Sequence, residues 1–150
     1  DGRRQISAFH LADEVFGFET DSTHHFFAEA ICGTGIRVLR LSSFRDERAG
    51  ELLPMALEGL IRTQEHLLVL GRQNAVERVA AFIADMSERQ GGLPQVELPM
   101  SRADIADYLG LTIETVSRIF TRLKHKDVIR LPNLRSVEIV KWQVLQELAS

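Results

Sequence analysis

Hydrophobic residues change their spacing along the chain, and the change predicts where strands give way to helices. In residues 1–44, short apolar bursts alternate with polar residues and are punctuated by Gly17 and Gly33, as in β-strands joined by turns. From residue 51 to 70 the apolar positions recur at steps of three and four, which is the period of a helix. Gly71 interrupts this pattern and is a candidate hinge.

The 51–70 helix carries a narrow apolar stripe typical of a coiled-coil seam. A polar residue inside such a stripe, here Gln64, can fix the register between two helices. We interpret the stripe as a homodimer interface, against the alternative of a helix packed on its own domain. The residues assigned to this interface are Leu53, Leu57, Leu60, Ile61, Gln64, Leu67 and Leu68.

Two short helices separated by a glycine are predicted at residues 102–109 and 113 to about 126. Ser101 and Thr112 are their expected N-caps, and Gly110 permits the tight turn between them. Such a pair is typical of a helix-turn-helix, whose second helix enters the major groove of DNA. The alternative is an ordinary helical hairpin, which also needs a glycine turn.

The elements on either side complete a winged helix. An amphipathic helix capped by Asn74 is predicted before the pair, up to residue 89. Strands Val128–Leu131 and Val137–Val140 are predicted after it, as a hairpin that forms the wing. A last short helix is expected to close the core with Trp142 and Leu145.

Composition narrows the class of protein. The chain has 150 residues, of which 45% are hydrophobic and 26% charged, and so it predicts an ordinary globular protein. The single cysteine, Cys32, excludes an internal disulfide framework and a cysteine-rich zinc site. No apolar run approaches the roughly 18–20 residues that span a bilayer, and no signal-peptide pattern occurs. We expect no membrane association and a cytoplasmic location.

Charge is unevenly distributed, although the net charge is only −3. Six Lys or Arg residues occur in 117–135, against the single acid Asp127. Glu114, Ser117 and Arg118 lie at i, i+3 and i+4 on one side of the second helix. Arginine can donate two hydrogen bonds to guanine, a carboxylate can accept one from cytosine, and serine can contact several bases. These three residues are the predicted base contacts, and a solvated helix face is the alternative.

A second group of residues is assigned to the phosphate backbone of double-stranded DNA. Basic side chains attract phosphates, and the wing follows directly after the basic end of the helix. The residues assigned to backbone contacts are Ser101, Arg102, Thr112, Thr115, Arg122, Lys124, Arg135 and Ser136.

The segment MSRADIADYLGLTIETVSRIFTRL resembles the recognition region of the Crp/Fnr family of bacterial transcription regulators. Glu114, Ser117 and Arg118 match the E-x-x-S-R pattern of its Fnr and FixK branches. FHLADEVFGFE and HHFFAEAI resemble the second half of the family's effector-binding β-roll, the 51–70 helix resembles its dimer helix, and NAVERVAAFI resembles the helix that follows. The resemblance covers essentially the whole chain.

The resemblance implies an α+β chain in three parts. These are a partial effector-type β-roll at 1–50, a dimerisation helix at 51–71 and a winged helix-turn-helix DNA-binding domain at 72–150. The match starts in the middle of the roll, so we expect a partial sequence whose unpaired strand edges are poorly ordered or pair abnormally.

The resemblance also implies how DNA is read. Each subunit of a homodimer would recognise a TTGAT half-site facing ATCAA, with Arg118 on the guanine, Glu114 on the C/A edges of the opposite strand and Ser117 on a thymine. RNA polymerase is the further partner implied.

Departures from the family pattern favour the FixK-like (Fnr-type) branch. Cyclic-nucleotide-binding relatives have an Arg-Ser pair where this chain has residues 24–27, HHFF. Oxygen sensors hold an iron–sulfur cluster with several cysteines, and their β-roll cysteine aligns near Arg37 rather than at Cys32. The resemblance therefore implies no built-in cofactor, with activation of genes for microaerobic respiration, nitrogen fixation or denitrification.

Three other interpretations stay open at this point. One is a metal site built on His24, His25 and Glu29, which is disfavoured because adjacent histidines on a strand point to opposite faces. No enzyme motif occurs in the sequence. An Fnr-type regulator whose sensing residues lie outside this chain is the first alternative, with Cys32 as a candidate redox residue or else a small buried residue on a strand. A dimeric helical protein-interaction module without DNA binding is the other.

Overall fold

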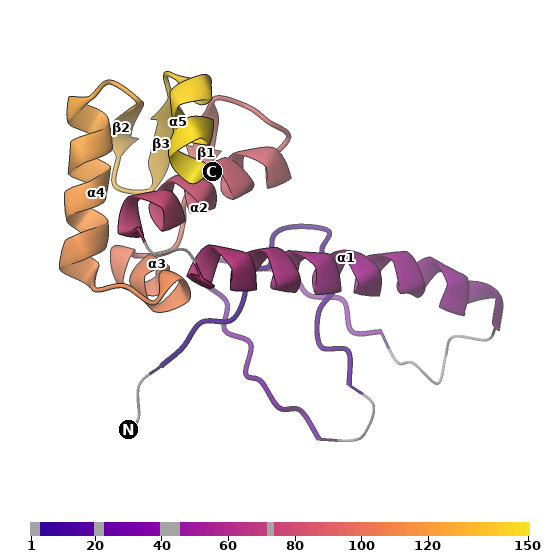
Figure 1. The fold of residues 1–150 in the computed structure, drawn as a ribbon. Helices are drawn as coiled ribbons and strands as arrows, with labels where there is room; N and C mark the ends of the chain where they lie inside the picture. The colour runs from indigo at the N-terminus through magenta and orange to yellow at the C-terminus, as the bar shows by residue number, and fades with distance from the viewer. Residues whose placement is uncertain (1–3, 20–22, 40–45, 72–73) are drawn as a thin grey trace. The chain divides into compact units, whose positions relative to one another are not determined.

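The computed structural model describes residues 4–19, 23–39, 46–71 and 74–150 (Figure 1). They divide into two compact units, one made of residues 9–65 and the other of residues 66–150 with the described part of 1–8. The boundary falls inside the long helix α1, so the predicted three-part division of the chain stays a prediction. Helices with a small antiparallel sheet confirm the α+β class.

Helix α1 runs from Asp46 to Gly71 and so begins five residues earlier than its apolar pattern predicts. Pro54 therefore lies inside the helix, where it removes one backbone hydrogen bond. Gly71 is the last helical residue, which agrees with its predicted role as an interruption. Among the described residues, no helix is long and apolar enough to cross a membrane.

Helix α2, Ala75–Arg89, forms the centre of the unit that contains residues 66–150. The Asn74 side chain accepts a hydrogen bond from the Val76 N–H, which confirms the predicted N-cap. Fully buried residues along one face, including Val79, Ile83 and Met86, pack into the core. Phe82, which the pattern did not single out, is buried as well.

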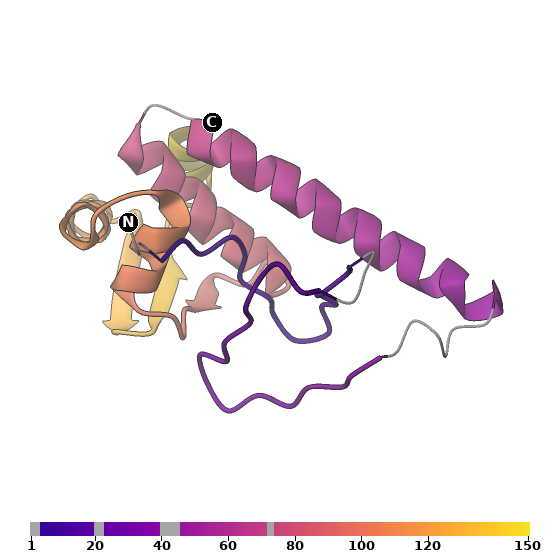
Figure 2. The same cartoon turned by 90° about the horizontal axis from the view of Figure 1, so that it is seen from below.

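Helices α3, Arg102–Leu109, and α4, Ile113–His125, form the predicted pair (Figure 2, in which α4 is seen nearly end-on). Ser101 and Asp104 close a reciprocal capping box at the start of α3. Gly110 ends α3 with φ of 62°, in the left-handed region that side chains with a Cβ rarely adopt. Thr112 accepts a hydrogen bond from the Thr115 N–H and so caps α4.

Three antiparallel strands form one sheet in the order β1-β3-β2. Strand β1 is Gln95–Glu97, β2 is Ile129–Asn133 and β3 is Ser136–Ile139. The wing hairpin is therefore confirmed, with ends one or two residues from those predicted. Because β3 is the central strand, its side chains are mostly buried. Helix α5, Trp142–Ala149, closes the core with Leu145.

The strands predicted in residues 1–44 are not found in described residues 4–19 and 23–39. That part of the prediction is wrong there, because a strand needs the N–H and C=O groups of a neighbour and these residues have no such ladder. Cys32 is exposed, so the interpretation of a buried residue on a strand is also wrong. Predicted strand positions at 20–22 and 40–44 lie outside the described residues.

Candidate nucleic-acid interface

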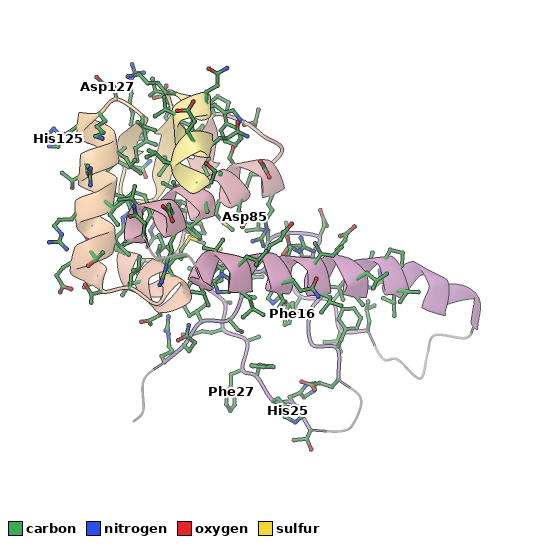
Figure 3. The ribbon with its side chains drawn as sticks, in the orientation of Figure 1. Phe16, His25, Phe27, Asp85, His125 and Asp127 are labelled. Carbon is green, nitrogen blue, oxygen red and sulfur yellow. The ribbon has the colours of Figure 1, made fainter. Side chains whose placement is uncertain are left out.

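Helix α4 has one buried and one exposed face. The buried face comprises Val116, Ile119, Phe120 and Leu123. Glu114, Ser117 and Arg118, the predicted base contacts, are exposed on the other face. Figure 3 shows side chains projecting outward along α4, with His125 near its C-terminal end. The apolar half thus anchors the helix while its polar half stays available to a ligand.

Hydrogen bonds connect the start of α4 to Arg118. The hydroxyl oxygens of Thr112 and Thr115 lie 3.1 Å apart, and Arg118 Nη2 donates to Thr115 Oγ1 at 3.4 Å. Thr121 Oγ1 donates to the Ser117 carbonyl at 3.0 Å. These local bonds restrict side chains on the exposed face before any ligand binds, which reduces the entropy lost on binding.

The start of α3 lies against α4 through Arg102. Its guanidinium carbon is 3.5 Å from the centroid of the Phe120 ring, a close cation–π contact. Burial lowers the pKa of Arg102, although arginine stays charged at neutral pH. A phosphate could therefore meet a guanidinium that is already held in place, and Ser101 beside it is exposed.

Asp104, in the first turn of α3, connects this helix to the N-terminal segment through an ion pair with Arg4. Burial alone would raise the pKa of its carboxyl, but hydrogen bonds from Ser101 and the ion pair with Arg4 together lower it. Asp104 is thus ionised at neutral pH and completes the cap of α3. Gln5 adds a hydrogen bond to the Asp107 carbonyl at 3.0 Å.

The basic residues assigned to phosphate contacts are largely accessible. Arg122 and Lys124 are exposed in the last turn of α4, and Arg135 is exposed at the turn of the wing. The Arg135 N–H donates to Asn133 Oδ1 at 2.7 Å, which fixes this turn. Ser136 is different: it is 1% exposed, so the expectation that its side chain contacts the DNA backbone is wrong.

The apolar stripe of α1 is exposed along its length. Leu53, Leu60, Ile61, Leu67 and Leu68 each expose more than half of their surface, Leu57 exposes 48%, and Gln64 is exposed as well. Removing these leucine side chains from water would lower the free energy, and an exposed apolar surface of this kind is typical of an interaction site. Its role as a dimer interface stays a prediction.

Long-range contacts that the sequence pattern did not reveal also shape this unit. Arg78 of α2 donates to the Leu109 carbonyl at 3.1 Å and so satisfies the C-terminal end of α3. Lys141 donates to the Lys126 carbonyl at 3.3 Å, just after α4. Donors of this kind have no local spacing signal, because their acceptors are at least 15 residues away.

The histidines considered as metal ligands do not form a site. In the described part of the chain, no group of three or more His, Cys, Asp or Glu residues could hold a metal ion. His25 instead pairs with Glu19, with 3.0 Å between Nδ1 and Oε2, and this contact lowers the pKa of Glu19.

Comparison with known proteins agrees with this architecture. The model of the Crp-like helix-turn-helix domain matches residues 77–148. The nitrogen fixation regulation protein FixK of Rhizobium meliloti is 55% identical over 150 residues, covering 100% of this chain and 71% of that protein. FixK of Azorhizobium caulinodans is 44% identical, covering 100% of this chain and 65% of that protein.

Solved structures give the same result. The structure of FixK2 from Bradyrhizobium japonicum matches with a TM-score of 0.66 and 37% identity, covering 73% of this chain and 55% of that chain. A CRP-family transcriptional regulator from Thermus thermophilus matches with a TM-score of 0.64 at 20% identity, covering 74% and 58%, which shows similarity of fold alone. The chain spans only part of the length of each of these proteins.

The FixK proteins and the matching domain are regulators, so the prediction that the chain is not an enzyme is confirmed. The chain belongs to the Crp/Fnr family of transcription regulators, in its FixK-like branch.

Proposed function

We propose that this chain reads TTGAT half-sites facing ATCAA as a homodimer. The observation that carries the proposal is the exposed row of Glu114, Ser117 and Arg118 on α4, whose opposite face is anchored in the core. Arg118 donates to guanine O6 and N7, Glu114 accepts from the opposite strand, and Ser117 contacts a thymine. Glu114 also repels phosphate, which disfavours binding to unrelated sequences.

The spacing of these residues suits adjacent base pairs. Glu114 and Arg118 are four residues apart, a rise of about 6 Å along a helix. Two base-pair steps rise by about 6.8 Å. One exposed helix face therefore reaches two or three consecutive base edges, which is enough to read part of a five-base half-site.

Dimerisation supplies the second half-site. Two copies of α1 that pair through their exposed stripes bring two α4 helices into a two-fold arrangement, as a palindrome requires. Burial of this stripe is favourable by roughly 25 cal/mol for each Å² of apolar surface removed from water.

The remaining parts of the proposal concern the location, cofactor, further partner and target genes of the protein. We propose a cytoplasmic activator without a built-in cofactor, which contacts RNA polymerase at genes of microaerobic respiration, nitrogen fixation or denitrification. The support is the name of the two FixK relatives, nitrogen fixation regulation protein.

Phosphate contacts should be visible in the salt dependence of binding. We expect Lys124→Ala or Arg135→Ala to weaken binding to every duplex by a similar factor. Each should also reduce the slope of log K against log salt by about 1 per subunit, since one phosphate contact is lost. Fluorescence anisotropy across a salt series measures both quantities.

The matched control is Arg37→Ala, which removes an exposed positive charge outside the assigned interface. It should leave the slope unchanged. Equal slopes in Lys124→Ala, Arg135→Ala and the wild type would contradict the backbone assignments. A wild type with no salt dependence at all would favour the protein-interaction module instead.

A further inference from the structure

Three polar side chains at the start of α4 form a chain of hydrogen bonds that ends on Arg118. The hydroxyl oxygens of Thr112 and Thr115 lie 3.1 Å apart, and Arg118 Nη2 donates to Thr115 Oγ1 at 3.4 Å. The three residues follow one another at steps of three, so they are neighbours on the helix surface. Thr112 and Arg118 are exposed, whereas Thr115 between them is half-buried.

The acceptor that holds Arg118 carries no charge. Among the described residues Arg118 forms no ion pair, although Glu114 lies one turn earlier on the same helix. A threonine hydroxyl orients a guanidinium without neutralising it, so the full positive charge remains available to DNA. The guanidinium has five N–H donors, of which Thr115 uses one, and a bidentate contact with guanine takes two more.

The two threonine hydroxyls also leave one donor for the DNA backbone. Thr112 Oγ1 already accepts the Thr115 N–H at 3.2 Å, and each hydroxyl has one hydrogen and two acceptor sites. One hydroxyl hydrogen forms the bond between Thr112 and Thr115, in whichever direction it points. The other hydrogen is then free to donate to a phosphate oxygen while Thr115 still accepts from Arg118. A backbone contact and a base contact thus share one hydrogen-bond network.

We propose that Thr115 is a positioning residue, whose hydroxyl holds the Arg118 guanidinium in the orientation that reads guanine. The inference rests on the proposed function, because this orientation matters only if Arg118 contacts a base. A bidentate contact requires the plane of the guanidinium to align with the guanine edge, and a long side chain loses conformational freedom on reaching it. An anchor that is already present in the free protein reduces this loss.

The hydroxyl of Thr115 can be removed without removing the cap of α4. The cap is the bond from the Thr115 backbone N–H to Thr112 Oγ1, which does not involve the Thr115 side chain. Valine has the branched Cβ of threonine but no hydroxyl, so Thr115→Val removes the anchor alone. Thr115→Ser restores the hydroxyl. Thr121→Val is the matched control, since Thr121 Oγ1 donates to the Ser117 carbonyl instead.

The test is a double-mutant cycle between Thr115 and Arg118, measured by anisotropy on two duplexes at one salt concentration. One duplex carries TTGAT/ATCAA, and the other has the guanine–cytosine pair replaced in both half-sites. The proteins are the wild type, Thr115→Val, Arg118→Ala and the double variant, with Thr115→Ser and Thr121→Val measured alongside.

We expect Thr115→Val to weaken binding to the palindrome by about two- to tenfold per half-site, the effect typical of one hydrogen bond. Its effect on the substituted duplex should be much smaller, and so should its effect on either duplex once Arg118 is alanine. Thr115→Ser and Thr121→Val should keep the guanine preference of the wild type. Unchanged binding of Thr115→Val would overturn the proposal. A loss by one common factor on both duplexes that persists in the Arg118→Ala background would also overturn it, because Thr115 would then be a backbone contact only.

NMR relaxation of the Arg118 side-chain Nε–H group in the DNA-free chain supplies a reading that does not depend on DNA. The order parameter of this group should fall in Thr115→Val and recover in Thr115→Ser, and no change would overturn the proposal. Equal binding of the wild type to both duplexes would instead contradict the proposed DNA reading. A restricted Arg118 in such a chain would overturn the positioning role and leave only a local contact.

Discussion

Arg118→Ala should lower affinity for the TTGAT/ATCAA duplex by about 1–3 kcal/mol per half-site and remove the preference for guanine. Arg118 is exposed on α4, and its loss removes a bidentate donor without disturbing the core. Competition with duplexes substituted at the guanine position measures the preference directly. Wild type should discriminate against these duplexes, whereas the variant should bind them all alike.

Arg118→Lys is the informative control, since it keeps the charge but not the planar fork. We expect it to retain the salt slope and to lose most of the guanine preference. If Arg118→Ala weakened all duplexes by one factor and flattened the salt slope, Arg118 would be a phosphate contact. The assignment of base contacts would then be wrong.

Leu60→Glu should convert the proposed dimer to a monomer. At the proposed seam, two carboxylates would be buried opposite each other, and an unpaired buried charge costs several kcal/mol. Half-site affinity per monomer remains, but the gain from binding two half-sites together is lost. Sedimentation velocity measures the oligomeric state, and anisotropy measures the loss of palindrome binding.

Leu93→Glu is the matched control for this variant. Leu93 is 61% exposed, similar to 53% for Leu60, but it lies outside α1. It should sediment like the wild type. A Leu60→Glu variant that remained dimeric would place the dimer interface elsewhere on the chain.

Local signals made the DNA-binding unit predictable. Asn74, Ser101 and Thr112 cap helices through residues two or three positions away, and Gly110 makes its turn through its own backbone. The buried and exposed faces of α4 follow from the helical period. These features need no knowledge of the rest of the fold, and the structure confirms them.

Features that depend on distant partners were not predictable. Ser136 appeared to belong to an exposed wing, but β3 is the central strand and buries it between β1 and β2. The stack of His66 on Tyr108 joins residues 42 positions apart and leaves no trace in either local pattern. The strands predicted before residue 45 failed at the described positions for a related reason, because alternation alone does not supply a neighbouring strand.

Arg102 has one feature that the sequence predicts and one that depends on a distant partner. Its position at the first turn of α3 is evident from the sequence, and so is its charge. Its stacking on Phe120 is a tertiary contact that only the structure reveals. The same side chain can thus stabilise the α3–α4 pair and meet a phosphate, a combination that Arg102→Lys would separate, since lysine keeps the charge but stacks less well.

The most direct test of DNA reading is anisotropy binding to the TTGAT/ATCAA duplex and to a scrambled duplex of equal length and composition. It is performed in air, without cyclic nucleotide, over a salt series. We expect preferential binding to the palindrome by a factor of at least about 10³, with both affinities falling as salt rises. Equal affinity for the two duplexes in a sample that sediments as a dimer would contradict sequence-specific reading of the palindrome.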